Sequence, residues 1–197
     1  MEPSSMNRRQ LLSGIGVAGL GAIAGCNSRF AKTESLGPPT VENPEPGVYY
    51  YDFSHRDEHV VNVDVGIRRR SAPGERAKLS LSVGPQTDGW KTDRIRFTLR
   101  APPAGPPSDT ARVLLDVDTG ASYPLSLRVT EQGDRVIEFD GLADAELGTS
   151  TIPLELELVP KTAVESLALQ AETRWRGPDE TRFEASFTGR LAVPASQ

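Results

Sequence analysis

The stretch Val61-Asn62-Val63-Asp64-Val65-Gly66-Ile67 decides the fold class, because apolar residues alternate along it with polar or small ones. Successive side chains of a β-strand point to opposite faces of the sheet, so a period of two predicts one buried face and one solvated face. Parallel sheets are covered on both faces and need continuous apolar runs instead. The stretch therefore predicts a strand of an antiparallel sheet.

The same alternation recurs along the chain from residue 47 onward, between turn sequences rich in Gly, Pro and Asp. One segment, 164–175, also fits helical spacing, but the Gly177-Pro178 turn and the alternation beyond it favour a strand. We predict an all-β fold for residues 47–197, an immunoglobulin-like antiparallel β-sandwich of about eight to ten strands. The expected strands are 48–53, 61–67, 79–83, 95–99, 113–117, 125–129, 136–139, 152–158, 167–175 and 183–193.

Residues 1–26 have the composition of an export signal. Asn7-Arg8-Arg9-Gln10-Leu11-Leu12 gives a basic start, and Ile23-Ala24-Gly25-Cys26 places small residues before a cysteine. Between them, the apolar run from Leu11 to Gly25 has fifteen residues, of which five are Gly. A helix that spans a membrane needs about 20 strongly apolar residues, so this run is too short and too weak to span comfortably.

This combination resembles the twin-arginine lipoproteins of halophilic archaea and some bacteria. The resemblance covers about the first 28 residues, and translation begins at either Met1 or Met6. It implies that Arg8, Arg9, Leu11 and Leu12 are read by the twin-arginine export machinery, which exports folded proteins. It also implies that a two-chain lipid is attached to the sulfur of Cys26, which anchors the protein at the extracytoplasmic face of the cell membrane. An unmodified Cys26 in an uncleaved anchor helix is the alternative.

Residues 27–46 have the composition of a tether between the anchor and the folded domain. They include Pro38, Pro39, Pro44 and Pro46 with only scattered apolar residues, and such a segment cannot bury enough surface to order itself. We therefore predict a disordered, semi-extended spacer.

The net charge of the chain is −5, and removal of residues 1–25, which contain Arg8, Arg9 and Glu2, makes it −6. A mild acidic excess argues against nucleic acid as a partner. Cys26 is the single cysteine, so the chain forms no internal disulfide.

Two clusters are candidates for binding chemistry. His55, Asp57 and His59 lie at alternate positions and, on one continuous strand, would share a face and offer ligands to a metal ion. Tyr50 is the residue of an aromatic cluster that points away from the core face, and Trp90 lies beside a turn. These two aromatic side chains are candidates for stacking on a carbohydrate or a protein partner.

Other patterns are weaker. The loop that follows Asp116 departs from the calcium-binding pattern, because Ala121 stands at the loop position that needs Gly. The stripe Arg94, Arg96 and Arg100 is expected to form cross-strand ion pairs with outward acids such as Glu155 and Glu157.

The sequence contains no phosphate-binding loop and no nucleophile elbow. We therefore predict a non-enzymatic, membrane-anchored surface lipoprotein without a cofactor, whose domain has a structural or recognition role. The alternative is a metal- or carbohydrate-binding extracellular module.

Overall fold

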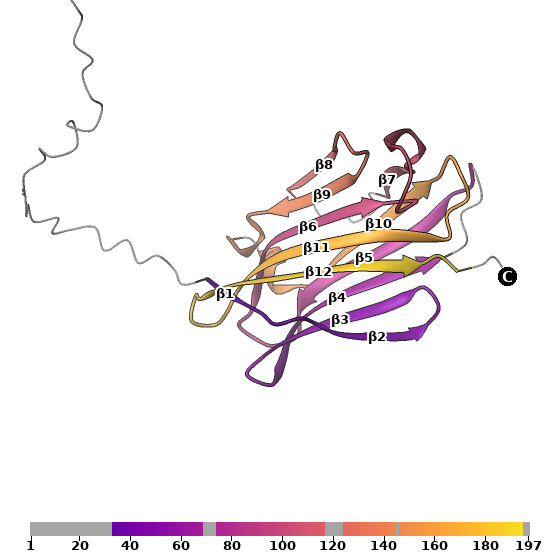
Figure 1. Cartoon of the computed structure of the whole chain (residues 1–197). Helices are drawn as coiled ribbons and strands as arrows, with labels where there is room; N and C mark the ends of the chain where they lie inside the picture. The colour runs from indigo at the N-terminus through magenta and orange to yellow at the C-terminus, as the bar shows by residue number, and fades with distance from the viewer. Residues whose placement is uncertain (1–32, 69–73, 117–123, 145, 195–197) are drawn as a thin grey trace, which may run out of the picture. The chain divides into compact units, whose positions relative to one another are not determined.

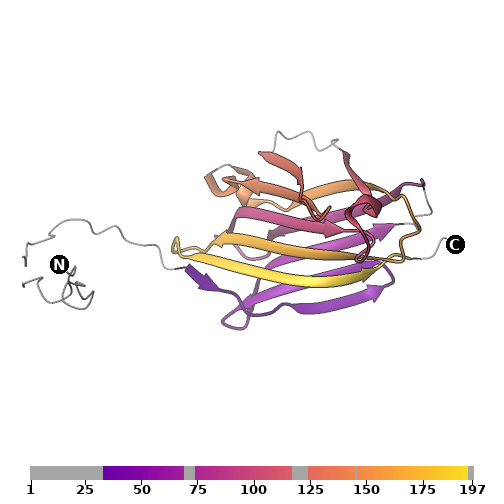
Figure 2. The ribbon, with the colours of Figure 1, turned by 45° about the horizontal axis from the view of Figure 1, so that its top comes forward.

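The computed structural model describes residues 33–68, 74–116, 124–144 and 146–194, which form two stacked sheets (Figures 1 and 2). The first sheet has the strand order β1–β12–β11–β6–β9–β8 and the second has the order β2–β3–β4–β5–β10–β7. Every strand pairing is antiparallel except that of β1 with β12. The β-sandwich that the alternation predicted is confirmed.

The elements follow one another along the chain as twelve strands and three short 3-10 helices within the described residues. The strands are β1 (Thr33–Ser35), β2 (Thr40–Glu45), β3 (Val48–His55), β4 (Glu58–Arg68), β5 (Ala77–Pro85), β6 (Lys91–Arg100), β7 (Arg112–Asp116), β8 (Leu125–Val129), β9 (Arg135–Asp140), β10 (Ile152–Val159), β11 (Ser166–Arg176) and β12 (Arg182–Ala192). The 3-10 helices are η1 (Pro107–Asp109), η2 (Leu142–Asp144) and η3 (Glu146–Thr149).

The core lies between the sheets and consists of the residues that alternate inward. Along β4, Val61, Val63, Val65 and Ile67 are all buried, as the sequence pattern requires. Trp175 on β11, in the segment that also fitted helical spacing, is fully buried. Each predicted strand is present, so the alternation located all ten of them.

The prediction of a disordered tether over 27–46 was wrong from residue 33 onward, because β1 and β2 lie within it. Thr33 pairs with Arg182 in parallel register, and the backbone N–H of Leu36 donates to the carbonyl of Glu184 at 2.8 Å. The Leu36 side chain is 6% exposed and belongs to the core. Residues 27–32 lie outside the described residues.

The prediction from composition failed at this segment because backbone hydrogen bonds, and not buried side chains, hold β2 in place. All six residues of β2 are exposed, yet the strand pairs with β3 along the edge of the second sheet. An existing strand edge offers unpaired N–H and C=O groups to any extended neighbour, and hydrophobicity does not report that. The chain thus changes sheets between β1 and β2, and the described part of the sandwich begins with β1.

Among the residues described, no helix has the length and apolar character needed to cross a membrane. The predicted signal, including Arg8, Arg9, Leu11, Leu12 and Cys26, lies outside the described residues.

The corrected boundary predicts that Leu36 contributes to stability. The substitution Leu36→Ala should lower the free energy of unfolding by about 2–3 kcal/mol, because it removes buried methyl groups and leaves a cavity. Val41 on β2 is 53% exposed, so Val41→Ala should change that free energy by less than about 0.5 kcal/mol. Urea unfolding of the purified protein measures both, and equal small effects would restore the view that this segment is a tether.

Candidate functional site

Three connections meet at one end of the sandwich, which we call the hairpin end. They are the β3–β4 turn (residues 56–57), the β5–β6 loop (86–90) and the β11–β12 loop (177–181). Thr87 joins the first two, because its hydroxyl donates to the carbonyl of His59 at 2.8 Å. A Cβ built on Gly89 would lie 3.1 Å from Cγ of Pro178, so the second and third connections are also in close contact.

The β3–β4 turn has a strained backbone. Arg56 and Asp57 have φ values of 51° and 66°, the left-handed pair that a two-residue hairpin turn requires. Glycine and asparagine suit these positions best, because a Cβ disfavours positive φ. The β11–β12 loop repeats the feature at Glu180, whose φ is 61°.

Among the described residues, the three non-glycine residues with positive φ therefore all lie in these two hairpins. Backbone strain of this kind gathers at functional sites more often than elsewhere, so its location singles out the hairpin end.

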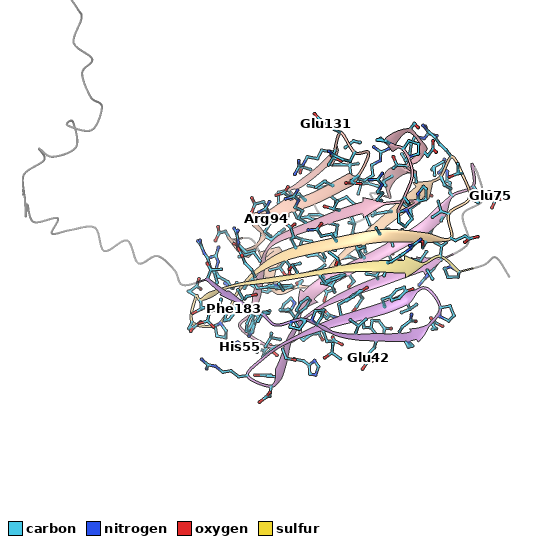
Figure 3. The ribbon with its side chains drawn as sticks, viewed as in Figure 1. Glu42, His55, Glu75, Arg94, Glu131 and Phe183 are labelled. Atoms are coloured by element: carbon cyan, nitrogen blue, oxygen red, sulfur yellow. The ribbon has the colours of Figure 1, made fainter. Side chains whose placement is uncertain are left out.

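Three aromatic rings pack together beneath the turns. The ring centroids of Trp90 and Phe183 are 4.6 Å apart, and His55 meets the ring of Phe183 at 4.9 Å in an edge-on arrangement. Trp90 and Phe183 are 5% and 4% exposed, whereas His55 is only half-buried. Figure 3 shows His55 and Phe183 close together at the end of the sandwich where β1 lies.

A cleft of about 310 Å³ opens above these rings. This is close to the lower end of the usual size of ligand pockets, and apolar walls with a few polar groups are their usual lining. The lining residues are Glu34, His55, Arg56, Glu58, Val60, Trp90, Pro178, Asp179, Thr181 and Phe183. We call this the end cleft.

Carboxylates outnumber cations around the end cleft. The backbone N–H of Thr181 donates to the Asp179 carboxylate at 3.1 Å, and this bond holds the pKa of Asp179 below its ordinary value. The Arg56 guanidinium, on the other hairpin, lowers that pKa further. Glu58 and Glu34 add two more acidic side chains to the lining, so the cleft favours a cationic group.

The structure contradicts the predicted metal site. His55 is paired with Glu58 and Ser54 with His59 across the turn, and residues directly opposite in a hairpin lie on the same side of the sheet. His59 therefore lies on the side opposite to His55, and Asp57 is at the exposed tip of the turn. Within the described ranges, no group of three or more His, Cys, Asp or Glu residues is placed to hold a metal ion. The two-residue turn is the reason, because it interrupts the continuous strand that the prediction assumed.

The two aromatic candidates are separated. Trp90 belongs to the buried core, where its ring is covered by Phe183 and His55, so it offers no open face to a sugar. Tyr50 lies half-buried in the middle of β3, where it pairs with Glu42 and Asp64. Tyr51 and Phe53 are buried on the core face, and Tyr50 is on the other face, as its predicted orientation requires.

The arginine stripe of β6 is paired, but with other partners than those predicted. Arg94 bonds Glu138, and the ion pairs of Arg96 with Glu172 and of Arg100 with Asp134 measure 3.6 Å and 3.5 Å. These acids lie on or beside the neighbouring strands of the first sheet. Glu155 and Glu157 lie on β10 in the other sheet, so they are out of reach of the stripe. Two hollows on this face, of about 330 and 380 Å³, are lined by the same charged rows.

Sequence reasoning missed Phe183, Arg56 and Asp179 as parts of a site. Phe183 follows the alternation of β12 and looks like any core residue. The signal that could have found them was weak. Charged or aromatic residues flank both the turn after β3 and the loop after β11. Whether these two connections lie at the same end of the sandwich depends on the order of strands in the sheets, which the sequence does not state.

Comparison with protein-family models gives one match. The model described as a domain of unknown function (DUF8121) matches residues 33–195. The chain belongs to this family. The match begins at Thr33, the first residue of β1, and includes β2. A comparison with curated proteins gives no match.

Solved structures with a similar fold include two cohesin modules and a pilin. The seventh ScaB type I cohesin from Pseudobacteroides cellulosolvens is 13% identical, with 68% of this chain and 92% of that chain covered and a TM-score of 0.40. A cohesin module of a Clostridium perfringens family 33 glycoside hydrolase is 13% identical, with 70% and 98% covered and a TM-score of 0.42. The major pilin subunit of Bacillus cereus is 9% identical, with 73% and 41% covered and a TM-score of 0.40. Likenesses of this size say nothing about what this member of the DUF8121 family binds.

The strain in the β3–β4 turn yields a prediction. Replacement of Arg56-Asp57 by Asn-Gly should raise the free energy of unfolding by about 1 kcal/mol, because these residues adopt the left-handed conformation with less strain. The adjacent control Glu58→Gly places glycine in a regular strand and should lower it by about 0.5–1 kcal/mol. Denaturant titration measures both; a loss of stability in the Asn-Gly variant would contradict the assignment of strain.

The surroundings of Tyr50 yield a second prediction. Burial raises the pKa of Asp64 and the neighbouring Asp52 raises it further, while the Asn62 amide, which donates to Asp64 at 3.0 Å, opposes the shift. A raised pKa in the folded state means that stability falls as pH rises from the unfolded pKa of Asp64 through the folded one. Asp64→Asn should therefore raise the melting temperature at pH 7, and the gain should vanish below both pKa values. Thermal melts at pH 3 and pH 7 test this, and an equal gain at both would exclude the charge as its cause.

Proposed function

We propose that this protein is a lipid-anchored recognition module at the extracytoplasmic face of the cell membrane, exported through the twin-arginine pathway. The paired Arg8 and Arg9 and the terminal Cys26 of the first 26 residues support export and anchoring.

The end cleft is the observation that carries recognition. It combines a ligand-sized opening with aromatic walls, acidic side chains and two strained hairpin tips. Its lining gives a binding surface for a cationic group, whereas the alternatives of metal or carbohydrate binding rested on residues that the fold separates.

The anchor is tested on the full-length chain produced in a host with a twin-arginine pathway. We expect the membrane fraction to contain a chain that begins at Cys26 and whose intact mass exceeds the polypeptide by a two-chain lipid. Cys26→Ser should release the domain from the membrane, because no second signal replaces the lipid. Arg8→Lys with Arg9→Lys should leave an unprocessed precursor inside the cell.

The control for this experiment is Met1→Ala, which leaves Met6 as the start and should preserve export and processing. A full-length, unmodified chain in the cytosol of the wild-type strain would refute the proposal.

A further inference from the structure

We propose that the hairpin end faces the membrane, and that the end cleft binds a lysine- or arginine-bearing segment of another protein held in the same membrane. The inference rests on the lipid anchor at Cys26 of the proposed function and adds to it an orientation and a kind of partner. Three observations carry it: the register of β1, the length of chain that precedes it, and the charge of the hairpin end.

The register of β1 fixes where the folded domain receives its N-terminal chain. Thr33 pairs with Arg182, the first residue of β12, and the two strands run in the same direction. The β11–β12 loop ends immediately before Arg182, so the chain enters the sandwich at the hairpin end (Figure 1). Glu34, the next residue of β1, lines the end cleft itself.

The chain between the anchor and the domain is short. Seven residue steps separate Cys26 from Thr33, and a fully extended chain advances at most about 3.6 Å per step, or about 25 Å in all. The eleven residues of β12 rise by about 37 Å from the hairpin end to the opposite end. An inverted domain, with its opposite end on the bilayer, would need a longer chain than the sequence provides. Lipid on Cys26 therefore keeps the hairpin end near the membrane.

The charge of this end selects the partner. The three connections themselves, 56–57, 86–90 and 177–181, carry four carboxylates (Asp57, Asp88, Asp179 and Glu180) against one arginine (Arg56). Anionic lipids repel the acidic tips of these connections, which disfavours their direct contact with the lipid headgroups. A cationic segment at the membrane surface complements it.

The end cleft has the groups that such a segment needs. Glu58 and Asp179 line it from opposite hairpins, and carboxylates bind ammonium and guanidinium groups through charge-assisted hydrogen bonds. Trp90 and Phe183 lie in its floor but are almost completely buried, and the half-buried ring of His55 is the one beside which a long aliphatic stem can pack. The short tether confines the cleft to the gap above the bilayer, where a membrane-held segment has a high effective concentration.

Orientation is tested with the lipidated full-length protein in neutral vesicles that contain an acceptor-labelled lipid. Because the lipid consumes Cys26, a new cysteine can be labelled alone with a donor dye. Ser54, exposed near the hairpin end, and Ala104, exposed in the loop after β6 at the opposite end, are the two positions. We expect at least threefold higher energy-transfer efficiency from Ser54→Cys than from Ala104→Cys. Twenty Gly/Ser residues inserted after Asn27 should reduce this difference, because the tether then no longer prevents inversion.

The partner is tested in the same vesicles with a synthetic membrane-spanning peptide whose outer extension contains four lysines, or four glutamates in the control peptide. With an acceptor on the peptide, transfer from Ser54→Cys should be at least threefold higher for the lysine peptide. Glu58→Gln with Asp179→Asn should abolish that difference. Glu75→Gln with Glu131→Gln, which removes the same charge from two exposed sites outside the cleft (Figure 3), should preserve it.

The outcomes separate the two proposals. An intact mass without lipid on Cys26 refutes the proposed function and this inference with it. With the lipid present, equal transfer from the two label positions overturns the orientation alone. Equal transfer to the lysine and glutamate peptides, or an unchanged difference in the Glu58 and Asp179 variant, overturns the cationic partner while the anchor stands.

Discussion

The packing of two inner sheet faces against each other is the interaction on which the rest of the structure depends. Alternate residues of β4 and β11 point into one shared core, and Trp175, Phe97 and Phe53 fill its centre. Burial of side chains this large supplies most of the free energy that opposes the entropy of the chain. The outer faces are then free to carry charge, and the strand ends are free to carry turns that regular structure would not favour.

The hairpin end contains backbone conformations that regular structure does not favour. Positive φ at a non-glycine residue costs on the order of 1–3 kcal/mol in the worst cases and persists only where the surroundings determine it. Here Arg176 bonds Asp93 and Asp144 and lies 3.7 Å from Glu180, which ties the β11–β12 loop to β6 and η2. Thr87 fixes the other hairpin through the carbonyl of His59. Hydrogen bonds and ion pairs to neighbouring elements thus hold both strained turns in place.

The sequence could predict the features that depend on side chains, and it failed where the backbone or the topology decides. Alternation located Val61, Val63 and the other inward residues correctly, because apolar side chains favour the buried face of a strand. It could not reveal β2, whose side chains are all exposed and whose order comes from hydrogen bonds to β3. The assumed face shared by His55 and His59 failed for a related reason: two residues of turn reverse the chain and put His59 opposite Ser54.

The end cleft could not be predicted because its lining comes from three connections and the ends of β1, β3, β4 and β12, which only the sheet order brings together. The sequence pattern predicts His55 as a metal ligand and Trp90 as a stacking residue, and the alternation along 183–193 gives no sign that Phe183 packs against both rings. The pairing of Thr33 with Arg182 could not be predicted either, since neither segment has a sequence pattern that indicates it. Yet this short parallel pairing fixes the position in the sandwich of Thr33, the residue seven steps after Cys26. It places the start of β1 at the end of the sandwich that carries the cleft, so any attachment through the preceding residues would act at that end.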